Sequence, residues 1–260
     1  MQRRQVAKTD LWVSALGLGT VKLGRNQGVK YPKQFSIPDD RAVLSLLSQA
    51  KELGINLIDT APAYGSSEER LGSLLHKVKN DWLICTKVGE SFEQGQSSFD
   101  FTPEAAQLSI ERSCQRLNVD CLDMVLVHSD GNDEYIIQHF GILDYLSDLK
   151  KTGKIRAFGM STKTVEGGIL AASQADIVMA TYNLADQSEQ PVLDYATANQ
   201  KAIFVKKALG SGHICLEDGD PVKKSMAFIF AHPAVTSTIV GTITPTHLAH
   251  NAACISEVLD

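Results

Sequence analysis

MVLVHSD, residues 124–130, begins with four apolar residues, ends that run at a histidine and passes at once into a polar segment. AIFV, residues 202–205, has the same character and is followed by Lys206. Strands that are apolar almost throughout are typical of parallel sheets covered on both faces. The two runs therefore predict buried parallel strands.

Short apolar runs of this kind recur along the whole chain, separated by longer amphipathic stretches. The pattern predicts eight strands, at residues 16–20, 56–59, 82–87, 124–128, 156–161, 177–182, 202–207 and 237–241. It predicts eight helices, at residues 39–53, 68–76, 103–117, 134–151, 165–174, 189–199, 221–232 and 246–258. Thr102 before Pro103 has the form of an N-cap followed by the first helical residue, and Gly54 and Gly153 fall just past helix ends.

The ends of these strands distinguish the two folds that eight such units can form, a closed barrel and an open doubly wound sheet. Five runs end in polar residues: Asp59, Lys87, His128, Ser161 and Lys206. In a barrel all strand ends face one pocket, so these side chains can meet over one ligand. We therefore predict an α/β fold, a (β/α)₈ TIM barrel that forms a single domain over residues 1–260.

Several segments lie outside this alternation. Residues 4–12 precede the first barrel strand and lead into no helix, which predicts an N-terminal β-hairpin closing the barrel bottom. GLGTVKLG, residues 17–24, resembles a glycine-rich phosphate loop, but we expect no helix to begin there and hence no Rossmann site. The irregular segments 22–37, 89–101 and 211–220 follow strands one, three and seven. We predict that they form pocket walls, the alternative being surface loops without function.

The amino-acid composition limits the classes of partner that the protein can bind. A formal charge of -5 and a pI near 5.8, with no basic run longer than two residues, argue against nucleic acid or an acidic membrane surface. Five cysteines without a CxxC pair predict a reduced, metal-free chain in the cytoplasm. No apolar run of about 20 residues is present to span a membrane. We expect a small-molecule partner and a monomer.

Tyr64 is the candidate acid of the predicted pocket. It follows Asp59 in DTAPAYG, residues 59–65, where Pro62 and Gly65 stiffen the turn. A phenol titrates near 10, so it needs a cation to stabilise its anion, and Lys87 can supply that charge. Asp59 is placed to neutralise Lys87. Taken singly, Asp59 could cap a turn, Lys87 could be a solvated strand end and His128 a satisfied core histidine.

These residues carry a family resemblance. DTAPAYG, the strand that ends in TK at Lys87 and VLVHSD around His128 resemble, in order and spacing, the Asp, Tyr, Lys, His tetrad of the aldo-keto reductase superfamily. The resemblance extends over nearly the whole chain through LGLGT at 16–20, FGMS at 158–161, TYN at 181–183, LGSG at 209–212 and HLAHN at 247–251.

The resemblance implies reduction of an aldehyde or ketone by hydride transfer from a nicotinamide cofactor, without a metal. Tyr64 would protonate the developing alkoxide, Lys87 would lower the tyrosine pKa, Asp59 would hold Lys87 charged, and His128 would donate to the carbonyl oxygen. It also implies these cofactor-binding residues: Gly19, Thr20, Asp59, Ser161, Thr162, Lys206, Lys207, Leu209, Ser211, Gly241, Thr242, His247 and Asn251.

Departures from the family pattern concentrate in the cofactor site. Thr162 and Met179 stand where asparagine and glutamine commonly bind the nicotinamide carboxamide, and Lys206 replaces an aromatic ring. Strand alternation predicts that one of Lys206 and Lys207 points outward. His247 stands in place of the arginine that binds the adenosine 2′-phosphate, and an imidazole is a poorer phosphate clamp than a guanidinium. NADPH is therefore the family expectation, and NADH is possible.

The sequence is also compatible with two other functions. One is a nicotinamide-binding redox sensor or regulatory subunit with little turnover, and the other is a non-redox barrel enzyme such as a lyase or isomerase. The complete tetrad favours the reductase over the sensor. The absence from the sequence of a Schiff-base arrangement or a metal-ligand cluster disfavours the lyase or isomerase.

Overall fold

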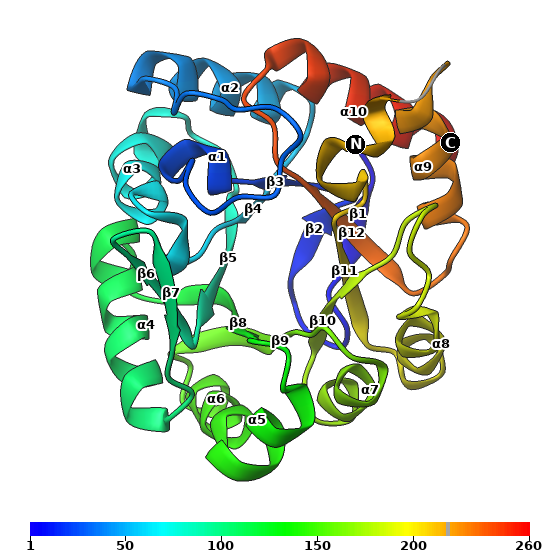
Figure 1. Cartoon of the computed structure of the whole chain (residues 1–260). Helices are drawn as coiled ribbons and strands as arrows, with labels where there is room; N and C mark the ends of the chain where they lie inside the picture. Colours follow the sequence, from blue (N-terminus) through cyan, green and yellow to red (C-terminus); the bar gives the residue numbers. More distant parts are fainter. Residues whose placement is uncertain (217–218) are drawn as a thin grey trace.

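The computed structural model, which describes residues 1–216 and 219–260, confirms the (β/α)₈ barrel. Eight parallel strands form a closed ring in sequence order (Figure 1). They are β3 (Leu16–Gly19), β4 (Leu57–Asp59), β5 (Leu83–Val88), β8 (Leu122–His128), β9 (Ile155–Ser161), β10 (Ile177–Thr181), β11 (Ala202–Lys206) and β12 (Val235–Val240). β12 pairs with β3 through Thr238 and Leu16, which closes the barrel.

Helices cover the outside of this ring (Figure 1). They are α2 (Asp40–Glu52), α3 (Ser67–Leu74), α4 (Pro103–Leu117), α6 (Ile142–Lys151), α7 (Val165–Gln174), α8 (Gln190–Asn199), α9 (Pro221–Phe230) and α10 (Pro245–Leu259). The predicted start of α4 is confirmed, because Thr102 Oγ1 accepts a hydrogen bond from the Ala105 amide and Pro103 is the first helical residue. Gly54 and Gly153 have φ near +77° and +76°, as residues just past helix ends often do.

The segment predicted as one helix over residues 134–151 is two helices, α5 (Asp133–Phe140) and α6, so that prediction was wrong at its centre. Gly141 joins them with φ +64°, a left-handed conformation that ends one helix and redirects the chain into the next. The apolar periodicity continues across this residue, which is why the pattern did not reveal the break.

Two further segments predicted as irregular contain short elements. Residues 90–99 form a hairpin of β6 (Glu90–Glu93) and β7 (Gln96–Phe99), which turns through Gln94 and Gly95, both with positive φ. A single helical turn, α1 (Val21–Gly24), follows β3, contrary to the expectation that no helix begins there. Short 3₁₀ turns complete the described elements: η1 (Pro62–Tyr64), η2 (Leu75–Lys77), η3 (Gly210–Gly212) and η4 (Ile214–Leu216).

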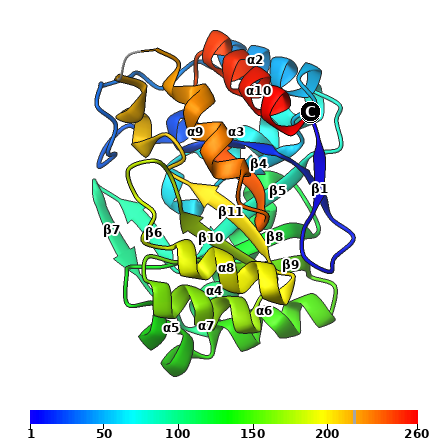
Figure 2. The ribbon, with the colours of Figure 1, turned by 90° about the vertical axis from the view of Figure 1, so that its right-hand side faces the viewer.

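The N-terminal hairpin closes one end of the barrel, as predicted. β1 (Arg3–Gln5) pairs antiparallel with β2 (Trp12–Ser14). Val6 and Leu11 from the hairpin join a buried cluster with barrel residues such as Met124 and Phe204. Figure 2 shows this hairpin and the β6–β7 hairpin at opposite ends of the barrel. A second apolar cluster fills the layer between the strands and the helices.

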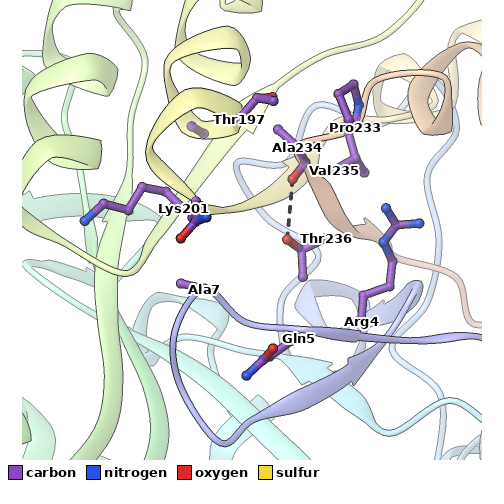
Figure 3. Close-up of a pocket in the computed structure, with 11 residues that line it drawn as sticks. Arg4, Gln5, Ala7, Thr197, Lys201, Pro233, Ala234, Val235 and Thr236 are labelled. Carbon is purple, nitrogen blue, oxygen red and sulfur yellow. Dashed lines mark hydrogen bonds between the residues drawn. The ribbon is translucent and has the colours of Figure 1, made fainter.

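A hollow of about 360 Å³ lies beside the N-terminal hairpin (Figure 3). It is lined by small apolar residues such as Ala7, Pro233 and Val235, by uncharged polar side chains, and by the cations Arg4 and Lys201. Its lining offers no acid or base pair for proton transfer.

In the described part of the chain, no helix combines the length and apolar character needed to cross a membrane.

Candidate active site

The larger cavity, of about 950 Å³, lies at the carboxyl ends of the barrel strands. That volume is typical of small-molecule and cofactor sites. Asp59, Tyr64, Lys87 and His128, which are far apart in sequence, all line it. Successive strands of the ring carry Asp59 on β4, Lys87 on β5 and His128 on β8, while η1 carries Tyr64 directly after β4.

Lys87 and Asp59 form a buried ion pair. Lys87 Nζ lies 2.6 Å from Asp59 Oδ1 and also donates to the Thr60 carbonyl oxygen at 2.8 Å. Burial alone would lower the pKa of Lys87, but the charge and hydrogen bond of Asp59, together with Tyr64 and Cys85, outweigh burial and hold that pKa above its ordinary value. Lys87 is therefore a fixed cation at the end of the cavity.

Tyr64 lies against this cation, with Lys87 Nζ 4.9 Å from the centroid of its ring. Burial raises the pKa of the Tyr64 phenol above its ordinary value; the charge of Lys87 opposes this shift and that of Asp59 adds to it. Lys87 thus acts in the expected direction, but desolvation is the larger effect. The phenol is protonated at neutral pH and can serve as a proton donor.

His128 meets Tyr64 edge to face, with ring centroids 6.2 Å apart. Its Nδ1 lies 2.7 Å from Oε2 of Glu90, the first residue of β6. Burial lowers the pKa of His128, while the Glu90 carboxylate raises it and the charge of Lys87 lowers it further. Glu90 was missed in the sequence because it belongs to the segment predicted as an irregular loop, where no periodicity indicates which side chains face inward.

The predicted cofactor-binding residues divide into two groups. Those that line the cavity are Gly19, Asp59, Ser161, Lys206, Lys207, Leu209, Ser211, Gly241, Thr242, His247 and Asn251. Thr20 and Thr162 are fully buried away from it. Thr20 Oγ1 donates to the Asp59 carbonyl oxygen, and Thr162 Oγ1 donates to Glu189 Oε2 at 3.3 Å. Both hydroxyls hold neighbouring segments together and are turned away from a ligand in the cavity.

Lys206 and Lys207 both line the cavity, although strand alternation predicted that one would point outward. Lys207 has φ +53°, a left-handed conformation that ends β11 and breaks the alternation. Lys206 Nζ donates to Ser161 Oγ at 3.0 Å and to the Thr162 carbonyl oxygen. Burial lowers the pKa of Lys206 to about 8, although the charge of Glu189 partly opposes that shift.

Residues from the loops complete the cavity. Lys22 and Tyr31 come from the segment 22–37, and the Lys22 ammonium lies 4.1 Å from the centroid of the Tyr31 ring. Cys215 and Asp220 come from the segment 211–220, of which residues 217–218 lie outside the described residues. These two segments act as walls, as predicted. The segment 89–101 does not line the cavity but supplies Glu90 behind His128.

The residues present fit a dinucleotide cofactor. Gly19 and Gly241 face each other on the cavity wall, and a Cβ at Gly241 would lie 3.4 Å from both the Gly19 carbonyl oxygen and the Tyr31 hydroxyl. Helix α10 begins beside Thr242, and its N-cap residue Thr244 makes no side-chain capping hydrogen bond. The amides of its first turn are therefore free of a capping side chain and can bind an anionic group.

The fold and this geometry define a class: a (β/α)₈ barrel with a phenol, a buried lysine–carboxylate pair and a histidine around a nucleotide-sized cavity. Comparison with known proteins agrees. Residues 15–220 match the model of the Aldo/keto reductase family. A solved structure of a Pseudomonas aeruginosa protein described as an aldo-keto reductase superposes with a TM-score of 0.90 at 49% identity, covering 99% of this chain and 95% of that one.

Curated relatives are more distant. An NADH-specific methylglyoxal reductase of Escherichia coli is 28% identical over 82% of this chain and 68% of its own length. An uncharacterized oxidoreductase of Bacillus subtilis is 25% identical over 87% of this chain and 71% of its own. The chain belongs to the aldo/keto reductase family. Membership of this family indicates that the protein is an NAD(P)H-dependent oxidoreductase, with carbonyl reduction as the general chemistry.

Proposed function

We propose that this protein reduces an aldehyde or ketone to the corresponding alcohol, with Tyr64 as the proton donor. The observation that carries the proposal is the Tyr64 phenol in the cavity, next to an ion-paired lysine and an imidazole. A nicotinamide cofactor, when bound, would supply the hydride for the carbonyl carbon. As negative charge develops on the carbonyl oxygen, Tyr64 transfers its proton to that oxygen.

Lys87 and Asp59 make this proton transfer easier without entering it. The tyrosinate that remains after transfer lies beside the Lys87 ammonium, which stabilises the anion. Asp59 keeps the ammonium charged and fixed in position. His128 contributes a polar ring at the same end of the cavity, where it can orient the carbonyl oxygen.

We further propose that the cofactor lies along the eleven cavity-lining residues named above, with its phosphates toward the start of α10. NADPH is expected from the family. His247 in the place of an arginine, and the Asp220 carboxylate 3.1 Å from His250 Nε2 at the same rim, both weaken recognition of a 2′-phosphate. NADH is therefore expected to bind as well.

The test is a Tyr64→Phe variant assayed with methylglyoxal, the compound in the name of the Escherichia coli relative, and with a panel of aldehydes. Loss of carbonyl reduction by about 100-fold or more is expected, since general acid catalysis contributes ~10²–10⁴-fold. Binding of NADPH and NADH, followed by fluorescence, should be unchanged. Tyr145→Phe, on the outer helix α6, is the matched control. Full activity in Tyr64→Phe would refute the acid role.

A further inference from the structure

Glu90 is a largely buried carboxylate held in place against the candidate active site. Its side chain is 12% exposed. Ser97 Oγ, from the partner strand β7, donates to Glu90 Oε1 at 2.6 Å, and this leaves Oε2 to face His128 Nδ1 at 2.7 Å. Burial raises the pKa of Glu90, but its contacts with His128 and Ser97 outweigh burial and bring it to about 2. Glu90 is therefore ionised at neutral pH.

The contact fixes which edge of the imidazole faces the cavity. His128 Nδ1 is buried, and Glu90 Oε2 lies close to it but off the line of an ideal hydrogen bond, so the contact becomes an ion pair when the ring is protonated. No other polar atom among the described residues bonds to Nδ1. Because Nδ1 is turned toward Glu90, the opposite edge of the ring, which carries Nε2, is presented to the cavity that His128 lines.

Proton counting then gives the state of Nε2. A neutral imidazole carries one proton, and a carboxylate oxygen 2.7 Å from Nδ1 requires that proton on Nδ1, since two lone pairs would otherwise face each other. Nε2 is then a hydrogen-bond acceptor. It becomes a donor only when the ring takes up a second proton, and the negative charge of Glu90 favours that imidazolium state.

We propose that Glu90 is a positioning residue that holds His128 through Nδ1, so that a carbonyl oxygen in the cavity meets an Nε2–H donor only when His128 is an imidazolium. This inference rests on the proposed carbonyl reduction and deepens it. Catalysis then depends on His128 protonation and declines as pH rises and the imidazolium is lost.

Other charges face His128 from the surrounding elements and determine the pH at which activity declines. Lys87 on β5 and Lys206 on β11 both oppose the imidazolium. Tyr64 on η1 meets the His128 ring edge to face, and its raised pKa keeps the phenol neutral. Arg25 lies near Glu90, where its guanidinium stacks 3.3 Å from the centroid of the Phe92 ring and donates to the Ala63 carbonyl oxygen. Glu90 is thus the group that favours His128 protonation.

The experiment compares the wild type with Glu90→Gln and Glu90→Leu. ¹⁵N NMR of histidine-labelled full-length protein reports which ring nitrogen carries the proton, with His128 assigned by its loss in His128→Asn. Steady-state reduction of methylglyoxal is measured against pH in parallel at saturating cofactor. Glu93→Gln is the matched control, because Glu93 is exposed on the same strand.

The wild type and the two Glu90 variants are expected to differ in their pH profiles. In the wild type, neutral His128 carries its proton on Nδ1 and kcat falls on the alkaline side. Glu90→Gln keeps an acceptor but loses the charge, so the fall moves to lower pH by about one unit or more. In Glu90→Leu the proton is free to move to Nε2, so the alkaline fall disappears. Glu93→Gln follows the wild type.

The NMR and kinetic results separate this inference from the proposed function. A neutral wild-type His128 with its proton on Nε2 overturns the inference, whatever the activity. An alkaline fall that stays in place in both Glu90 variants also overturns it. If His128 carries the Nδ1 proton but no carbonyl in the panel is reduced although cofactor binds, the proposed function fails and the catalytic role of Glu90 fails with it.

Discussion

Lys87 Nζ lies 2.6 Å from Asp59 Oδ1, and the two side chains are only 1% and 5% exposed. A pair in this position differs from the surface pairs of the molecule, because water cannot replace either partner. Removing one charge leaves the other buried and uncompensated, which costs about 3–5 kcal/mol. The pair that serves the proposed chemistry is therefore also a determinant of folding stability.

Asp59→Asn is expected to lower the free energy of unfolding by about 3–5 kcal/mol and to lower carbonyl reduction together with it. Asp59→Asn combined with Lys87→Met should recover much of the stability and none of the activity. Denaturant unfolding and steady-state kinetics measure the two effects. Glu257→Gln, which breaks an exposed pair with Lys223 at 2.6 Å, should cost less than ~1 kcal/mol. Equal losses from Asp59→Asn and Glu257→Gln would contradict this account.

Lys206 is predicted to reduce stability at neutral pH. Its pKa of about 8 lies below the ordinary 10.5, so the unfolded chain binds more protons and stability rises with pH between about 8 and 10.5. Lys206→Met should raise the free energy of unfolding at pH 7 by a value on the order of 1–3 kcal/mol. The melting temperature should rise with it. That gain should shrink as pH rises through this window. Lys207→Met, at the exposed neighbour, should show no such pH dependence. Melting curves at several pH values would decide between these outcomes.

Much of the site was predictable because strand periodicity and a shared barrel end place residues without knowledge of loops. Asp59, Lys87 and His128 each end an apolar run, and the barrel brings them to one cavity. The direction of a hydroxyl was not predictable, because it depends on distant partners. Thr20 accepts from Ser67 Oγ at 2.8 Å, 47 positions along the chain.

Local backbone geometry was not predictable from the sequence for the same reason. Nothing in the periodicity around Lys207 indicates the left-handed turn that brings both lysines to the cavity. Glu90 reaches His128 only because residues 90–99 fold back as a hairpin, a contact between segments that alternation does not encode. The fold thus follows from patterning, while the groups that tune the site follow from loop contacts.

Gly159 is predicted to be irreplaceable in the barrel wall. A Cβ at this position on β9 would lie 1.9 Å from the Ile177 carbonyl oxygen of β10, and backbone cannot move aside as a side chain can. Gly159→Ala should cost about 3 kcal/mol or more. Gly153→Ala, where no atom lies within 4 Å but φ is +76°, should cost only ~1–2 kcal/mol from backbone strain. Urea midpoints compare the two, and a milder effect at Gly159 would contradict the packing argument.

His247→Arg is predicted to shift cofactor preference toward NADPH. His247 lines the cavity in the third residue of α10, next to the first-turn amides proposed to bind phosphate. A guanidinium there can bind a 2′-phosphate through two charge-assisted hydrogen bonds, each stronger than a neutral one. The ratio of the Kd for NADH to that for NADPH should therefore rise about tenfold or more, equivalent to ~1.4 kcal/mol. Fluorescence titration measures both constants without a substrate.

His76→Arg adds the same charge on η2, outside the cavity lining, and should leave the ratio unchanged. An unchanged ratio in His247→Arg would place the adenosine end of the cofactor elsewhere in the cavity.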